Sequence, residues 1–529
     1  LSQSSAPGAP ASGPTSVHQT STSISLGWTA PASDGLSGAD ASGYRLYNVA
    51  GATPQLLYAG PATAYEQVGL TAGTSYSYAV SAVSAAGESP STSTLVQYTA
   101  PAAPTGLSSS AWTTSSFDVS WVAPSVGDGP AVTGYTLYER VTYDMADVGS
   151  SGGIPDDVLQ TMLHEHTDTV VVDTVAYDGS SSTAVTTSLS GLSGGVSYDY
   201  VVAARSSAGE GDRSTALSVS TSPPAPGSLG SVSQTTSSIT LSWSAPVVTT
   251  GSAVTGYKVY IDDGASGTPS SVVSCGGAAL ATTCTASGLT GGVTYSFEVS
   301  ALSTSGESDR SSVLTQSTAP AAVSGSMTFS SVTTTSMVLT WTAPVGATPT
   351  GYIVYRDAGD AQTPSIVVFE GDALTATVSG LTGGTSYSYM VAALSLAGVG
   401  DVSGVSSQST SPAAPLGLSS DTQTSTSITL SWSASVVSGG SAVTSYKVYH
   451  NDGSSAGAAL SSTAAHTTAD GSTTTATLSQ LSPGLLYSFA VSAVSDAGEG
   501  DQSSTLSQSS APGAPASGPT SLHQTSTSI

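Results

Sequence analysis

Charged residues are scarce in this 529-residue chain, and basic residues are nearly missing. Asp, Glu, Lys and Arg make up 8% of the sequence, and 34 acidic residues face 8 basic ones, which gives a formal net charge of −26. Proteins that bind nucleic acid neutralise its phosphates with clustered Lys and Arg. The composition therefore excludes nucleic acid as a regular partner.

Long apolar runs, asparagine and cysteine are also few. No apolar run reaches the ~18 residues that a membrane-spanning helix needs, so we expect no membrane span. The two asparagines, Asn48 and Asn451, begin no N-x-[ST] sequence, which excludes N-glycosylation. Cys275 and Cys284 lie in one short segment, and we interpret them as a local disulfide, with free thiols as the alternative. A disulfide fits an oxidising, extracellular setting.

Repetition is what the sequence has in abundance. A Trp that ends an alternating segment recurs five times, at intervals of 91 to 122 residues. These residues are Trp28, Trp121, Trp243, Trp341 and Trp432. A longer period lies above this one, because residues 1–24 and 506–529 differ only at Val17 and Leu522, with an offset of 505 residues. We therefore expect five domains to form one super-repeat of a longer array.

Each repeat alternates apolar and polar residues with a period of two. Ile24, Leu26 and Trp28 share one face of their segment, and a later segment places Tyr, Tyr or Phe, Val and Ala on one face. This alternation is typical of half-buried strands. Short strands between turn signals, with no helical period, predict an all-β fold of antiparallel sandwiches.

The repeated segments resemble the fibronectin type III domain. The resemblance rests on the Trp strand, on GY-x-[LV]-Y, and on GL-T-x-G-T-x-Y-x-Y-x-V-x-A. The tyrosines at the position of that family's tyrosine corner are Tyr76, Tyr198, Tyr295, Tyr387 and Tyr487. The resemblance implies tandem seven-stranded antiparallel β-sandwiches, arranged as beads on a string. It implies no single activity, because function depends on sites placed on the fold.

The repeats also predict where the domains begin and end. Residues 1–5 would be the last strand of a preceding repeat, and residues 510–529 the start of the next super-repeat. The five domains would occupy residues 6–99, 100–221, 222–317, 318–410 and 411–509. The second carries an insertion at about residues 140–185, and the third carries the cysteine pair.

Two segments raise the question of catalysis or metal binding. His164, His166 and Asp168 would share one strand face of the insertion and could bind Zn or Cu, or they could belong to a polar strand of an enlarged hairpin. The segment Gly191–Gly195 matches G-x-S-x-G, but that motif needs a strand, a turn and a helix, and here a Tyr strand follows. We predict no catalytic residue, and hence no enzyme.

Carboxylates recur near the predicted domain junctions, in the last hairpin of each repeat. They could hold Ca²⁺ there, or they could serve turn formation and solvation. They are Glu88, Glu210, Asp212, Glu307, Asp309, Asp401, Glu499 and Asp501. We predict no cofactor, with calcium at the domain junctions as the alternative.

The junctions combine Pro with Ala, Ser and Thr, as in TAPAAPTG. They predict short, semi-rigid extended linkers that could carry O-linked glycans. Surfaces of Ser, Thr, Gly and Ala lose their water at little cost, which favours lateral packing and self-association into fibres.

These features lead to a first hypothesis and two alternatives. The first is a non-catalytic structural protein, an extracellular filament, surface hair or matrix fibre whose building unit is the super-repeat. One alternative is the stalk of a cell-surface adhesin that presents a binding tip. The other is a spacer array of a secreted glycan-degrading enzyme.

Overall fold

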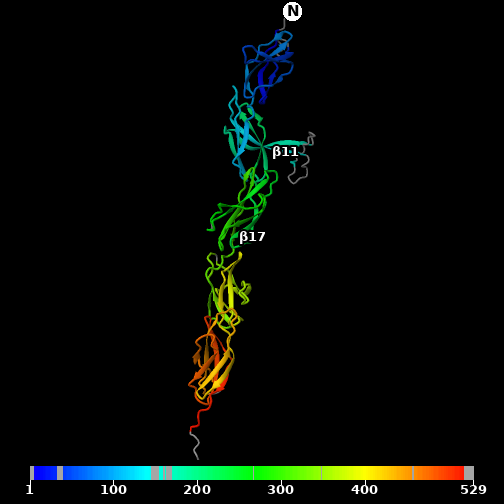
Figure 1. Cartoon of the computed structure of the whole chain (residues 1–529). Coiled ribbons are helices and arrows are strands. Elements are labelled where there is room, and N and C mark those ends of the chain that lie inside the picture. Colours follow the sequence, from blue (N-terminus) through cyan, green and yellow to red (C-terminus); the bar gives the residue numbers. More distant parts are fainter. Residues whose placement is uncertain are drawn as a thin grey trace, which may run out of the picture.

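The chain forms five β-sandwiches that follow one another end to end (Figure 1). The computed structural model describes residues 5–32, 40–144, 154–155, 157–158, 161–162, 169–265, 267–346, 348–454 and 458–516. Within these ranges, helical residues are confined to 157–158 and 161–162, and no helix could cross a membrane. The structure therefore confirms the all-β prediction.

The first sandwich contains two antiparallel sheets. The smaller one has the order β1-β2-β5, and the larger one has the order β4-β3-β6-β7, with β8 also paired to β6. Because β7 and β8 both pair with β6, they are two halves of one interrupted last strand. The strands are β1 (Ser12–Gln19), β2 (Ser23–Thr29), β3 (Gly43–Asn48), β4 (Gln55–Gly60), β5 (Ala64–Val68), β6 (Ser75–Ser84), β7 (Gly87–Glu88) and β8 (Leu95–Tyr98).

The same two-sheet arrangement recurs in the second and third sandwiches. The second contains β9 (Thr105–Ser110), β10 (Ser116–Val122), β11 (Gly134–Asp144), β12 (Thr169–Gly179), β13 (Thr186–Ser190), β14 (Ser197–Ser206), β15 (Gly209–Arg213) and β16 (Leu217–Ser220). The third contains β17 (Gly227–Gln234), β18 (Ser238–Ser244), β19 (Val254–Ile261), β20 (Ser271–Val273), β21 (Thr283–Ser287), β22 (Thr294–Ser303), β23 (Gly306–Glu307) and β24 (Leu314–Ser317).

The fourth and fifth sandwiches repeat it again. The fourth contains β25 (Thr328–Ser330), β26 (Ser336–Thr340), β27 (Gly351–Arg356), β28 (Ile366–Gly371), β29 (Thr375–Ser379), β30 (Ser386–Ser395), β31 (Gly398–Val402) and β32 (Ser406–Ser409). The fifth contains β33 (Leu416–Gln423), β34 (Ser427–Ser433), β35 (Val443–His450), β36 (His466–Thr467), β37 (Thr475–Ser479), β38 (Leu486–Ser495), β39 (Gly498–Gln502) and β40 (Leu506–Ser509).

The insertion in the second sandwich lengthens one hairpin. Strands β11 and β12 have 11 residues each and pair from Tyr135 with Gly179 to Asp144 with Thr169. The hairpin projects sideways from the row of sandwiches (Figure 1). The predicted metal-binding candidates His164, His166 and Asp168 lie outside the described residues.

A Trp from the smaller sheet packs against a Tyr from the larger sheet in every core. The five Trp side chains are 4–6% exposed, and each contacts its Tyr edge to face, a favourable geometry for aromatic pairs. The ring centroids are 5.8 Å apart for Trp28–Tyr44, 5.3 Å for Trp121–Tyr135, 5.3 Å for Trp243–Tyr257, 5.7 Å for Trp341–Tyr352 and 5.4 Å for Trp432–Tyr446. The alternation places each Trp on the inner face of its strand, where its contact with the Tyr joins the two sheets.

A second tyrosine fixes the turn that precedes it, which we name the tyrosine turn. In the fourth sandwich, the backbone N–H of Thr382 donates to the hydroxyl of Tyr387 over 3.0 Å. The same bond joins Thr71 to Tyr76, Ser193 to Tyr198, Thr290 to Tyr295, and Ser482 to Tyr487. Ser193 of the G-x-S-x-G segment is therefore a residue of this turn, between β13 and β14.

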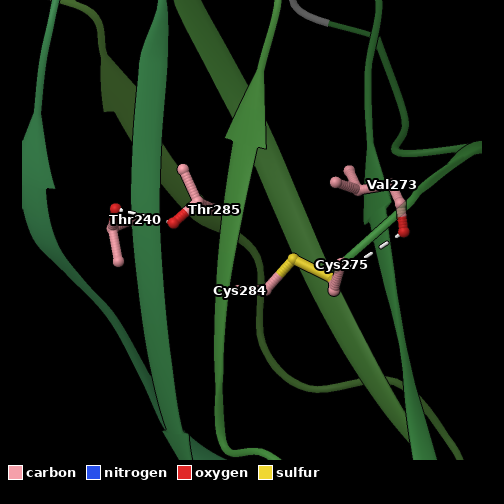
Figure 2. The surroundings of a disulfide bond; sticks show 5 residues. All are labelled: Thr240, Val273, Cys275, Cys284 and Thr285. Atoms are coloured by element: carbon pink, nitrogen blue, oxygen red, sulfur yellow. Dashed lines mark hydrogen bonds between the residues drawn. A yellow bond between two sulfur atoms is a disulfide. The ribbon is translucent and has the colours of Figure 1, made fainter. Parts of the chain in front are cut away.

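A disulfide between Cys275 and Cys284 closes one side of the third sandwich (Figure 2). Cys284 lies on β21 in the smaller sheet, and Cys275 follows β20 in the larger sheet. The bond therefore links the two sheets beside the core, where Cys284 is buried.

Removal of the Tyr387 hydroxyl should destabilise the fourth sandwich, because the Thr382 N–H then lacks its acceptor. We expect Tyr387→Phe to cost about 1 kcal/mol and to accelerate amide exchange there about fivefold. Hydrogen exchange with mass spectrometry on the whole chain measures this. Tyr389→Phe is the matched control, because the buried Tyr389 hydroxyl has no partner in the described part of the chain. Equal effects of both changes would contradict the role of the bond.

Candidate functional site

The joints between sandwiches repeat one set of contacts, and the linker is its first part. At the first joint, the N–H of Ala100 donates to Thr20 O over 3.0 Å, and the N–H of Gly73 donates to Ala100 O over 3.0 Å. Thr20 lies in the turn between the first two strands, which we name the first turn, and Gly73 lies in the tyrosine turn. Equivalent pairs hold Ser222, Ala319, Ser411 and Ala511. Each linker thus begins fixed to the sandwich that it leaves.

A buried hydroxyl strengthens this attachment. The Thr221 hydroxyl, one residue before the linker residue Ser222, donates to Ser193 O in the tyrosine turn over 2.8 Å. The equivalent hydroxyls of Thr99, Thr318, Thr410 and Ser510 do the same in their sandwiches. The extended linkers that we predicted are therefore anchored at their start, and these hydroxyls are engaged.

A hydroxyl-to-carboxylate hydrogen bond then joins each sandwich to the next. The donor is the residue of the first turn that follows Thr20 or its equivalent, and the acceptor is an Asp in the last hairpin of the following sandwich. We name this contact the joint bond. The four pairs are Ser21 with Asp212, Thr114 with Asp309, Thr236 with Asp401 (2.6 Å) and Thr334 with Asp501. In the first sandwich, Pro90 takes the place of the Asp.

At the first, second and fourth joints, the loop that follows the Trp strand makes a second contact with the preceding sandwich. The N–H of Gly129 donates to Gly73 O over 2.9 Å, and the N–H of Ser438 donates to Gly384 O over 2.8 Å. Gly251 and Gly195 form the same bond at the second joint. A side-chain carbon at Gly129 would lie 2.4 Å from Gly73 O, so this close approach requires glycine.

At these three joints, the two contacts and the covalent link attach one sandwich to the next through separate segments. One contact comes from the last hairpin and the other from the Trp loop, and both meet turns of the preceding sandwich. A single flexible link would allow bending and twisting, but bodies joined at three places resist both. The contacts at the joints therefore oppose bending and twisting between neighbouring sandwiches.

The glutamates of the same hairpins have a different role, within their own sandwich. Glu307 accepts hydrogen bonds from Lys258 Nζ over 2.7 Å, from the Ser300 hydroxyl over 2.6 Å and from the Tyr260 hydroxyl. We name this group the Glu cluster. It recurs around Glu88, Glu210 and Glu499, where Arg45, Arg205 and Lys447 supply the positive charge. The fourth sandwich has Val399 in place of the glutamate.

The cluster controls the ionisation of its glutamate. Burial alone would raise the pKa of Glu307, but the hydrogen bonds from Lys258, Ser300 and Tyr260 outweigh it and lower the pKa to about 2. The pKa values of Glu88 and Glu499 are lowered by the same kinds of contact. These carboxylates therefore remain charged well into acid.

The carboxylates that suggested calcium are thus divided between two sets of partners. The aspartates meet hydroxyls of the preceding sandwich, and the glutamates meet Tyr with Lys or Arg in their own. Among the described residues, no three of His, Cys, Asp and Glu gather into a metal-binding group. The sequence did not predict that hydroxyl groups would bind these aspartates. The donors lie in a run of Ser and Thr that recurs before every Trp strand, and they are Ser21, Thr114, Thr236 and Thr334.

Comparison with known proteins assigns the family. The Fibronectin type III domain matches residues 8–98, 102–220, 224–317, 320–409 and 413–509. The chain therefore belongs to the fibronectin type III family, as its strands and tyrosine turns predicted.

Three curated relatives match parts of the chain. Exoglucanase B of Cellulomonas fimi is 33% identical over 54% of this chain and 25% of its own length. Chitinase A1 of Niallia circulans is 38% identical over 34% of this chain and 24% of its own length. Endoglucanase B of Cellulomonas fimi is 30% identical over 64% of this chain and 28% of its own length. The chain thus spans about a quarter of each relative's length. A crystal structure of chicken CNTN1 FN1-FN3 domains aligns at 15% identity and a TM-score of 0.23, over 59% of this chain and 99% of that one.

Loss of the joint bonds should loosen the array and leave each sandwich folded. We expect D212A/D309A/D401A/D501A to broaden the distribution of end-to-end distances in small-angle X-ray scattering, with the circular dichroism spectrum unchanged. A control removes as many carboxylates from strands, as E66A/D118A/E139A/E370A. An unchanged scattering curve for the joint variant, or an equal change for the control, would show that these bonds do not set the shape.

The Glu cluster predicts a defined acid response. Because the folded pKa of Glu307 lies near 2 and the reference value is 4.5, its stabilisation is complete above pH 4.5 and disappears as the pH falls toward 2. Glu307→Gln should therefore lower the unfolding temperature of the whole chain at neutral pH, and the difference from wild type should shrink as the pH approaches 2. Differential scanning calorimetry over this range measures it. A pH-independent difference would refute the assignment.

Proposed function

We propose that the chain is a non-catalytic structural rod that builds an extracellular filament, surface hair or matrix fibre. The joint bond supports this most directly, because one hydroxyl–Asp pair recurs at four successive joints. A chain that needed flexible spacing between its domains would have no reason to repeat such a contact.

The geometry explains how such a rod transmits position and force. Tension passes along the backbone from the last strand of one sandwich to the first strand of the next, through a linker that begins hydrogen-bonded to its own sandwich. An eight-residue strand spans ~27 Å, so five sandwiches in line, with their linkers, extend ~150–200 Å. Rigid joints would preserve this length and give an assembly a regular axial period.

Other features of the chain are compatible with this role. The disulfide in the third sandwich agrees with an extracellular setting. Self-association and O-linked glycans remain part of the proposal, and the glycans would use exposed Ser and Thr, because Thr99, Thr221, Thr318 and Thr410 are buried. No catalytic role is assigned to Ser193, which belongs to a tyrosine turn.

A second candidate follows from the relatives. Exoglucanase B, Chitinase A1 and Endoglucanase B each match this chain over part of their length. A stiff array could equally serve as a spacer that holds a glycan-degrading catalytic domain at a fixed distance. The adhesin stalk would use the same geometry, and no separate observation favours it.

Electron microscopy of the chain and of the native material that contains it tests the proposal. We expect straight rods of ~150–200 Å for the chain, and ordered fibres with that axial period in the native material. Bent strings of beads would contradict the rod. Single rods that end in a distinct globular domain would contradict the filament and favour the spacer or the stalk.

A further inference from the structure

Part of the outer face of the larger sheet in the fourth sandwich is lined mainly by apolar side chains, whereas its other end carries serines such as Ser388 and Ser407. Strands β27, β28, β30 and β31 carry the apolar part. We name it the neutral face, and its residues are Ile353, Tyr355, Val367, Met390, Ala392, Leu394, Val399 and Val402.

The register of the strands places these residues beside one another. Ile353 pairs with Ala392, and Ala392 pairs with Val402. In the neighbouring rows, Leu394 pairs with Val399, while Tyr355 pairs with both Met390 and Val367. The residues between them on β27 and β30, such as Val354 and Val391, are buried in the core, so the side chains of the neutral face lie on the opposite side of the sheet. Ala392 in the middle row is itself 0% exposed, so the residues around it form the accessible surface. Val399 is 51% exposed, Val402 46% and Val367 53%.

The third sandwich provides an internal comparison. At the positions of Ile353, Met390, Ala392, Val399 and Val402 it has Lys258, Glu298, Ser300, Glu307 and Arg310. There, Lys258 pairs with Glu307, and Arg310 pairs with Glu298. These five positions are therefore polar or charged in the third sandwich and apolar in the fourth. Since the fold is the same, folding alone does not require this change.

We propose that the neutral face is where a second copy of this chain docks, face against face. A chain with a net charge of −26 repels its copies, so close approach is least costly where neither surface carries charge. The one ionisable side chain paired directly with these rows is Glu370, on edge strand β28. Identical apolar faces also match each other about a two-fold axis. Tyr355 is the face's one aromatic residue, so it offers no platform of rings for a polysaccharide.

The face is smaller than a stable interface. A durable contact buries ~800 Å² on each partner, whereas three short rows across four strands spaced ~4.8 Å apart cover far less. One such contact is therefore weak. In the longer array that we expect from the super-repeat, one neutral face per super-repeat would act together with the others through avidity. This inference rests on the proposed rod, because only stiff joints would bring successive faces into register.

The test transfers the residues of the sibling sandwiches to the neutral face. I353K/V399E installs the Lys–Glu pair of the third sandwich and leaves the net charge unchanged, so long-range repulsion does not differ from wild type. Sedimentation velocity of the whole chain over a concentration series, in about 0.5 M salt to screen repulsion, measures self-association. We expect wild type to associate weakly, and the variant to raise the dissociation constant more than about tenfold.

The reverse change provides the matched control. K258I/E307V gives the third sandwich the two residues of the neutral face that replace the Lys–Glu pair, and it should strengthen association. Hydrogen exchange should show that both variants remain folded. Wild type that stays monomeric, or a variant that associates as wild type does, would overturn the proposal. The proposal would also be overturned if wild type stayed monomeric and bound cellulose or chitin, and if I353K/V399E weakened that binding. X-ray scattering of the same samples separates the two proposals. A stiff chain that stays monomeric would contradict only the docking at the neutral face, whereas a flexible chain would contradict the proposed rod.

Discussion

The hydroxyl–carboxylate bond at each joint is the interaction on which the shape of this protein depends. A β-sandwich is stable through its own core, and here every core includes a Trp–Tyr contact between its two sheets. Those contacts fix the sandwiches but not the angles between them. The angles depend on the joint bond, on the backbone contact from the Trp loop, and on a linker that starts hydrogen-bonded to two turns. Without these contacts the same five sandwiches would form a flexible string.

Two carboxylates in one hairpin separate the stability of a sandwich from its attachment to the next. In the third sandwich, Glu307 stabilises the sheet through Lys258 and Tyr260, whereas Asp309 accepts the hydroxyl of Thr114 across the joint. In the fourth, the joint residue Asp401 remains, although Val399 has replaced the glutamate. The fourth sandwich therefore has the joint bond but no Glu cluster. Its outer sheet face, without the charged residues of that cluster, is available for another contact.

Much of the fold could be predicted from the sequence, but the joints could not. Period-two segments that end in Trp28 and its four counterparts define strands, because alternation follows directly from strand geometry. The resemblance to the fibronectin type III domain likewise placed Tyr76 and its counterparts at a tyrosine corner, which the structure shows as the tyrosine turn. The joint bonds link residues 165 to 195 positions apart, and no pattern within a repeat states how neighbouring repeats dock. Linkers rich in Pro predicted extension, but not their hydrogen bonds to the first turn. The neutral face became visible only when register placed Ile353, Ala392 and Val402 in one row.

The distribution of distances across one joint tests this account most directly. Val232 in the third sandwich and Leu374 in the fourth are exposed, and the two native cysteines are paired, so cysteines introduced at these positions can carry spin labels selectively. Pulsed electron paramagnetic resonance would then measure their separation in the whole chain. A single narrow distribution, which Thr236→Ala broadens, is the predicted result. A broad distribution in the unaltered chain would contradict the claim that the joints are rigid.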